Sequence, residues 1–263
     1  MKPLGYIDMV DEWEVEIPAL TGAVKRRAYV YLPDGYDYDE DRRYPVMYMF
    51  DGHNLFYDGH ATYGKSWGLA EYLDSTRTPL IVAAVECNHD GNGRLSEYSP
   101  VDFVMRNGDK IKGRGKKYMD WLVGAFKPYI DKNLRTLPDR SNTAIGGSSM
   151  GGLMTVYALA KYNRCFSRGA ALSPSLWACG GVPDFVLNGR FGKESVLYMD
   201  YGSKEFSNHG EQKKIFSMTA QTLMEKNVFL TSRVAPHGVH SEASWQKCIP
   251  VFMNVLGFLP QSD

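Results

Sequence analysis

The sequence predicts an α/β protein with a doubly wound, mostly parallel sheet, an antiparallel start and helices on both faces. Two observations lead to this fold class. After residue 45, short apolar segments alternate with segments of helical periodicity, and the connections between them are short. Before residue 45, the pattern is instead that of a strand, a turn and a second strand. The 263 residues contain no internal repeat, low-complexity tract or linker, so we expect a single domain covering 1–263.

The antiparallel start is expected from two strands that a turn separates. Residues 13–17 read Trp-Glu-Val-Glu-Ile, an apolar and polar alternation with the period of two that is typical of a half-buried strand. Residues 21–23, Thr-Gly-Ala, are a turn signal, and 26–32 follow as the second strand.

The parallel part is expected from short segments that are apolar over most of their length, as in strands buried on both faces. These predicted strands are 45–50, 80–85, 143–145, 169–173, 196–200 and 228–234. Between them, the helices are expected at 64–73, 116–134, 153–160, 209–226 and 241–256. Pro128 should bend or break the second of these helices. Residues 86–100 are expected to form a long irregular loop of the kind that often carries binding groups.

Composition excludes several partner classes. The formal net charge is zero, which gives no reason to expect a nucleic-acid partner or an anionic membrane surface. No apolar run approaches the roughly 18–20 residues of a membrane span. Residues 1–20 are acidic and lack the apolar core of a signal peptide, and the four cysteines show no CxxC or metal-type spacing. We therefore expect a cytoplasmic protein with reduced thiols, no metal and no cofactor.

The most informative stretch is Gly-Ser-Ser-Met-Gly at 147–151, which fits the pattern G-x-S-x-G. A predicted strand precedes it and a predicted helix follows it, which is the context that a nucleophile elbow requires. Ser149 would then lie on a strained turn above the sheet, with the N–H groups of the helix start directed at the reacting centre. The alternative is a turn that happens to contain a serine.

A serine nucleophile needs a base, which follows the last strand in proteins that carry this elbow. The loop after the strand 228–234 contains His237 and His240. We favour His240, because it immediately precedes the final helix, where a loop residue can turn back over the sheet. His237 would then serve only in loop packing.

The base must be oriented by an acid, which should follow a strand after the elbow. Asp200 ends the predicted strand 196–200, where the pleat fixes its direction. Glu205 lies in the loop beyond Gly202, which can curl toward His240, and it has one more methylene of reach. We therefore favour Glu205 and expect Asp200 to accept backbone N–H groups of the turn at Gly202 and Ser203.

An oxyanion hole and substrate contacts complete the expected site. One donor would be the backbone N–H of Met150, which follows the nucleophile. The other would be the N–H of His53 or Asn54, in the loop after the strand 45–50; in the alternative, Gly52 and Asp51 merely make a turn and a helix cap. Expected substrate contacts are given by Asn54 and three further loop residues, namely Arg94, Tyr98 and Trp177.

At these residues, the chain resembles the putative-esterase family of α/β-hydrolases, which includes esterase D-like enzymes, siderophore (enterochelin-type) esterases and feruloyl esterase domains. The resemblance extends from about Tyr29 to Leu259. The motifs that carry it are Tyr-Pro-Val at 44–46, Asp-Gly-His-Asn-Leu-Phe at 51–56, Arg94, Glu-Tyr-Ser-Pro at 97–100, Gly-Gly-Ser-Ser-Met-Gly-Gly at 146–152, Ser-Pro-Ser-Leu-Trp at 173–177, Gly-Ser-Lys-Glu at 202–205 and His-Ser-Glu-Ala-Ser-Trp at 240–245.

The resemblance implies an α/β-hydrolase fold and a triad of Ser149, Glu205 and His240. His53 departs from the family pattern, in which glutamine is expected, and this puts the substrate contact made there in doubt. The sequence thus predicts a metal-independent serine esterase that acts on a small, neutral, aromatic or short-chain ester. A siderophore trilactone esterase, a thioesterase, an acyltransferase and a non-catalytic binding protein with the same fold remain as alternatives, and the oligomeric state is open.

Overall fold

A computed structural model describes residues 10–205 and 210–259 of the chain. Its centre is an eight-stranded sheet with the strand order β1-β2-β4-β3-β7-β8-β9-β10. β1 pairs antiparallel with β2 and β2 with β4, and every later pairing from β4 to β10 is parallel. These strands are β1 (Val10–Glu16), β2 (Lys25–Tyr31), β3 (Val46–Met49), β4 (Ile81–Val85), β7 (Thr143–Ser148), β8 (Arg168–Leu172), β9 (Val196–Gly202) and β10 (Phe229–Ala235). The predicted fold class is confirmed.

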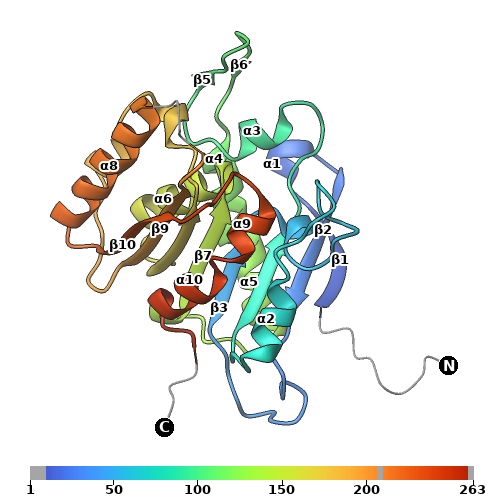
Figure 1. The fold of residues 1–263 in the computed structure, drawn as a ribbon. Coiled ribbons are helices and arrows are strands. Elements are labelled where there is room, and N and C mark those ends of the chain that lie inside the picture. Colours follow the sequence, from blue (N-terminus) through green and yellow to red (C-terminus); the bar gives the residue numbers. More distant parts are fainter. Residues whose placement is uncertain (1–9, 206–209, 260–263) are drawn as a thin grey trace.

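Helices cover both faces of this sheet (Figure 1). The longer ones are α2 (Leu69–Ser75), α4 (Gly115–Trp121), α5 (Lys127–Asn133), α6 (Met150–Lys161), α8 (Gly210–Glu225) and α10 (Ile249–Leu256). The shorter ones are α1 (Pro18–Thr21), α3 (Gly93–Glu97), α7 (Asp184–Leu187), α9 (Glu242–Gln246) and the 3-10 turns η1 (Gly52–Asn54), η3 (Arg140–Asn142) and η4 (Leu176–Cys179). A hairpin of β5 (Phe103–Val104) and β6 (Lys110–Ile111) projects beyond the sheet (Figure 1).

The core consists of two apolar layers, one on each face of the sheet. Alternate residues of a strand enter opposite layers: Val46 and Tyr48 pack with α4, α5 and α6, whereas Met47 and Met49 pack with α2, α9 and α10. This is the period-two geometry of a strand that is buried on both faces. It explains why β3 and β4 are continuously apolar in sequence.

Prolines divide two of the predicted helices. The helix expected at 116–134 is split into α4, a π-helical turn at Leu122–Phe126 and α5, with Pro128 in the first turn of α5. The helix expected at 241–256 is split into α9 and α10, with Pro250 in the first turn of α10. Proline is tolerated there because the first N–H groups of a helix need no partner within the helix.

Other elements also differ from the sequence prediction in extent. The helix expected from Gly64 begins only at Leu69, after a left-handed Gly68. The loop 86–100 contains the short helix α3. β9 extends to Gly202, which pairs with Ala235 of β10, so Asp200 lies inside the strand and not at its end. The helix expected from His209 is seen from Gly210, and His209 lies outside the described residues. Among the described helices, none is long and apolar enough to cross a membrane.

Candidate active site

The site is built around the turn between β7 and α6. Ser149 is the only residue between these two elements, and its backbone has φ 58° and ψ −119°, which is unusual for a residue with a side chain. The strained turn is held on both sides. The N–H of Ser149 donates to the carbonyl of Leu172 at 2.9 Å, and the carbonyl of Ser149 accepts from the N–H groups of Leu153 and Ser175 at 3.0 and 2.9 Å. Such strain persists only where the surrounding structure fixes it, and it is typical of functional sites.

Glycine is required beside this turn because strand and helix approach each other closely. A Cβ atom on Gly151 would lie 2.9 Å from Cβ of Phe50, and one on Gly147 would lie 3.1 Å from backbone atoms of Gly151. Any larger residue would push α6 away from the sheet. The two glycines of the motif therefore place the start of α6 directly beside Ser149.

Three side chains from separate loops form one hydrogen-bonded series. Nε2 of His240 lies 2.9 Å from Oγ of Ser149, and Nδ1 of His240 lies 2.8 Å from Oε2 of Glu205. The side chain of His240 is 47% exposed, whereas that of Glu205 is 3% exposed. The serine and histidine are thus accessible from solvent, and the acid lies behind them.

The Glu205 carboxylate is well supplied with donors. Its Oε1 accepts from the N–H of Gly202 at 2.6 Å and from Oγ of Ser173 at 2.7 Å, while Oε2 faces His240. Burial by itself raises the pKa of the Glu205 carboxyl, but the hydrogen bonds from His240, Ser173 and Gly202 outweigh it, and the pKa lies below its ordinary value. An ionised Glu205 favours the tautomer in which Nδ1 of His240 carries the proton and Nε2 can accept one.

Ser173 and Trp245 support the acid and the base. Nε1–H of Trp245 donates to Oγ of Ser173 at 2.9 Å, and Ser173 in turn donates to Glu205. The Trp245 ring also meets the His240 ring edge-on, with centroids 5.0 Å apart. Ser173 is the first residue of the motif Ser-Pro-Ser-Leu-Trp, and Trp245 is the last residue of the motif His-Ser-Glu-Ala-Ser-Trp. Both motifs are visible in the sequence, but only the fold shows that these two residues meet.

The two alternative residues, Asp200 and His237, make other contacts in the structure. Asp200 is buried and accepts hydrogen bonds from the hydroxyl of Tyr198 and the N–H of Ser173. Its expected bonds from Gly202 and Ser203 are absent, because the N–H of Gly202 donates to Glu205 and that of Ser203 to the carbonyl of Ala235. His237 is an exposed residue of the loop after β10, and its N–H donates to Oγ of Ser203.

The backbone N–H groups of Met150 and His53 are among those that have no hydrogen-bond partner within residues 10–205 and 210–259. Met150 is the first residue of α6, where a free N–H is expected. His53 lies in η1, directly after β3. The N–H of Asn54, the other expected donor, is already bound to the carbonyl of Asp51 at 2.8 Å.

Three of the residues expected to contact substrate, Asn54, Arg94 and Tyr98, make hydrogen bonds around η1. Arg94 donates from Nε and Nη2 to the two carboxylate oxygens of the buried Asp51, both at 2.7 Å. Burial raises the pKa of Asp51, but Arg94 outweighs this effect and lowers it. Tyr98 is fully buried, and its hydroxyl accepts from the N–H of Asp51. Asn54 accepts from the N–H of Thr62 and donates to Glu242.

Trp177 is the fourth residue expected to contact substrate. It lies in η4, is partly exposed and packs edge-on against Phe103 of the β5–β6 hairpin, with centroids 5.5 Å apart. Oγ of Ser175, which immediately precedes η4, lies 3.3 Å from Oγ of Ser149. Trp177 therefore follows, by two residues in the sequence, the side chain of Ser175 that contacts the candidate nucleophile.

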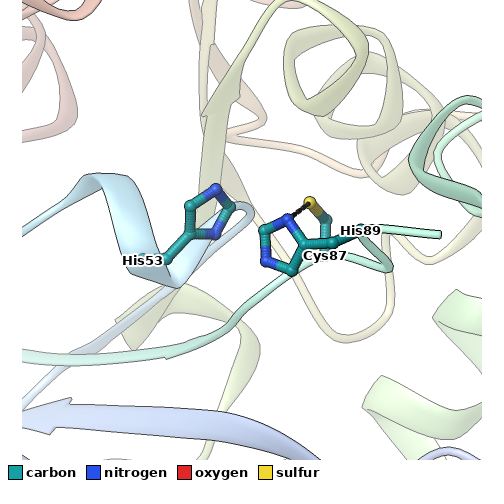
Figure 2. A group of neighbouring side chains, drawn as sticks. All are labelled: His53, Cys87 and His89. Atoms are coloured by element: carbon teal, nitrogen blue, oxygen red, sulfur yellow. Dashed lines mark hydrogen bonds between the residues drawn. The ribbon is translucent and has the colours of Figure 1, made fainter. Parts of the chain in front are cut away.

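The structure also brings together a group of possible metal ligands that sequence spacing did not reveal. His53, Cys87 and His89 each offer a ligand atom, and these atoms all lie within 4.8 Å of one another (Figure 2). The group lies on the loops that follow β3 and β4, which are adjacent parallel strands.

An eight-stranded sheet with a strained serine between a parallel strand and a helix defines an α/β-hydrolase-fold protein. The family described as putative esterases matches residues 22–252, and the chain belongs to that family. It is therefore an enzyme of the esterase class.

The chain is also similar to individual proteins. The chain is 26% identical over 187 residues to an uncharacterized protein YbbA of Bacillus subtilis, which covers 70% of each chain. It is 25% identical over 252 residues to an endo-1,4-beta-xylanase/feruloyl esterase of Xylanibacter ruminicola, covering 93% of this chain but only 30% of that protein. The crystal structure of an IroE-like serine hydrolase from Shewanella oneidensis superimposes with a TM-score of 0.72 at 22% identity, over 94% of this chain and 78% of that one.

Proposed function

We propose that the protein hydrolyses small carboxylic esters through an acyl-enzyme on Ser149. The observation that carries the proposal is the continuous series from Ser149 through His240 to Glu205, with contacts of 2.9 and 2.8 Å. A serine hydroxyl is a weak nucleophile unless a base takes its proton as it attacks. Nε2 of His240 is within the distance that a general base needs, and Glu205 holds the ring in the required tautomer.

The proposed reaction has two halves. In the first, Oγ of Ser149 attacks the ester carbonyl, and its proton passes to Nε2 of His240. His240 then gives that proton to the alcohol oxygen, so the alcohol leaves and the acyl group remains on Ser149. In the second half, water gives its proton to His240 and attacks the acyl carbonyl, which releases the carboxylic acid and restores the serine hydroxyl.

We propose that the N–H groups of Met150 and His53 stabilise the oxyanion that forms in each half. Both are without a partner within the described residues, and both follow the carboxyl ends of adjacent parallel strands, β7 and β3. Removal of one such donor typically costs about 10²–10³ in rate. The pair Arg94 and Asp51 would act indirectly, because it fixes the turn that presents the N–H of His53.

The proposed substrate is a small ester with an aromatic or short acyl group. Trp177 is partly exposed and follows Ser175 by two residues, and Oγ of Ser175 lies 3.3 Å from Oγ of Ser149, so Trp177 is our candidate contact for such a group. Feruloyl esters belong in the first test, because feruloyl esterase is part of the printed name of one relative. We also propose that the protein works in the cytoplasm, where its four cysteines, which are free thiols in the structure, would stay reduced.

The test compares Ser149→Ala with Ser148→Ala, its neighbour in the same motif. Both purified variants are assayed on p-nitrophenyl acetate, p-nitrophenyl butyrate, methyl ferulate and a thioester. The proposal expects Ser149→Ala to lose nearly all activity on every substrate that the wild type hydrolyses, while its melting temperature is kept. Full activity in a folded Ser149→Ala would overturn it. A wild type that prefers the thioester would reassign the substrate class and retain the mechanism.

A further inference from the structure

We propose that His53, Cys87 and His89 form a binding site for a borderline-soft divalent cation, with Zn²⁺ as the expected ion. Two imidazoles and a thiolate are the ligand types that Zn²⁺ prefers in proteins. They come from two loops: His53 from η1, after β3, and Cys87 and His89 from the segment after β4. None of the three belongs to the series of Ser149, His240 and Glu205, so this site is distinct from the proposed triad.

His53 is oriented as metal ligands usually are, and His89 has a carboxylate near its other ring nitrogen. A ligating histidine binds the ion through one ring nitrogen while the other nitrogen is held by an oxygen partner. Nε2 of His53 lies 3.0 Å from Oγ1 of Thr62, and Nε2 of His89 lies 3.8 Å from a carboxylate oxygen of Glu86. This leaves Nδ1 of each ring for the group itself. Nδ1 of His89 already lies 3.9 Å from Sγ of Cys87 (Figure 2).

His53 supplies the second observation that points to a ligand. Its side chain is buried, with 4% of the residue exposed, and its Nδ1 has no hydrogen-bond partner among the described residues. A buried polar atom that lacks a partner is costly and uncommon in folded proteins. An ion between His53, Cys87 and His89 would give this nitrogen the partner that it lacks.

The spacing and the burial of the group suit a cation. In a tetrahedral Zn²⁺ site, bond lengths of about 2.0–2.3 Å place neighbouring ligand atoms about 3.3–3.7 Å apart. The three ligand atoms lie within 4.8 Å of one another, so small side-chain rotations would bring them to that spacing. Cys87 is 3% exposed, whereas the His89 side chain is 55% exposed. The protein therefore supplies three ligands, and solvent can supply a fourth.

Binding of a cation by Cys87 requires its thiol to lose a proton. Burial raises the pKa of the Cys87 thiol, and the nearby Asp51 carboxylate adds to this effect. Without an ion, Cys87 is therefore a neutral thiol. A bound divalent cation favours the thiolate, so binding forms the sulfur–metal bond and releases the thiol proton to water.

The test measures binding directly. Chelator-treated wild-type protein is titrated with Zn²⁺ by calorimetry and with Co²⁺ by absorption, which reports a thiolate-to-Co²⁺ charge-transfer band. We expect one equivalent of each ion and one proton released for each ion bound. His89→Ala, at a half-exposed position that should tolerate the change, should weaken binding at least tenfold. Cys87→Ala should abolish the charge-transfer band, and Glu86→Gln should weaken binding about 10–100-fold.

Two control variants separate this site from other places where an ion can bind. Cys179→Ser removes a partly buried thiol outside the group, and His240→Ala removes the exposed histidine beside Ser149. Both should bind Zn²⁺ as the wild type does. The proposal is overturned if folded His89→Ala binds Zn²⁺ unchanged, if only His240→Ala loses binding, or if the wild type binds none. Since binding is the readout, the result does not depend on esterase activity.

Discussion

Replacing Glu205 by glutamine changes a single atom of the proposed triad, and the structure predicts how the new amide would orient. Oε1 of Glu205 accepts from two donors, the N–H of Gly202 and the hydroxyl of Ser173. The glutamine oxygen should take this place. In the flipped orientation, the amide N–H₂ would face those two donors, and two hydrogen bonds of about 0.5–1.5 kcal/mol each would be lost.

The amide N–H₂ of Glu205→Gln would then take the place of Oε2 and face Nδ1 of His240. In the wild type, Oε2 and Nδ1 are 2.8 Å apart. Nδ1 must then accept a hydrogen bond from the amide, so the ring proton of His240 moves to Nε2, which points at Ser149. A protonated Nε2 cannot take the serine proton. The equivalent change in a serine protease triad lowers kcat about 10⁴-fold, which corresponds to about 5.4 kcal/mol of transition-state stabilisation.

The assay is kcat on p-nitrophenyl acetate for Glu205→Gln and for Asp200→Asn, with melting temperatures alongside. Asp200 is the matched control, since it is a buried acid five residues before Glu205 in the chain. Its hydrogen-bond partners are Tyr198 and Ser173 and not His240. We expect a large loss of kcat with little loss of stability in Glu205→Gln, and mainly a loss of stability in Asp200→Asn. A normal kcat in Glu205→Gln together with a collapsed kcat in a folded Asp200→Asn would refute the reasoning.

Three further predictions concern the groups that hold the site in place. Ser173→Ala removes a donor to the ionised Glu205, so the pKa of Glu205 should rise and the acidic limb of the pH–rate profile should move to higher pH; an unchanged profile would contradict this. Arg94→Ala leaves the buried Asp51 unpaired and should cost about 3 kcal/mol of stability, or about 6–12 °C in melting temperature; a loss below 2 °C would contradict it. The folded-state pKa values of Asp51 and Glu205 are both lowered, so the ionised carboxylates stabilise the folded protein fully above the unfolded-state pKa values of about 4. This contribution is lost as the pH falls below those values. Thermal melts from pH 7 to pH 3 should show the loss, and the loss should be smaller in Arg94→Ala.

Local sequence patterns predicted the fold class because its elements are locally encoded. Strands buried on both faces are continuously apolar, and the elbow at Ser149 is a strand, a turn and a helix that follow one another directly from Thr143 to Lys161. The ends of elements were harder to predict. β9 continues past Asp200 because β10 pairs with it as far as Gly202, and a pairing between strands leaves no mark in the sequence of either one.

Contacts between distant loops were beyond local patterns for the same reason. Arg94 and Tyr98 both form hydrogen bonds with Asp51, which lies more than forty residues earlier in the chain. His53 lies more than thirty residues before Cys87, and only the parallel pairing of β3 with β4 brings their loops together. Side chains that meet in this way can be recognised only once the strand order is known.

The central claim is that Ser149 is the nucleophile and that His240 activates it. The most direct measurement is the stoichiometry and position of covalent labelling by a fluorophosphonate, determined by intact mass and peptide mapping. We predict one label per chain on Ser149, no label on Ser149→Ala, normal labelling of Ser148→Ala, and labelling slowed by orders of magnitude in His240→Ala but not in His237→Ala. A label on Ser148 or elsewhere, or an unchanged labelling rate in His240→Ala, would contradict the claim.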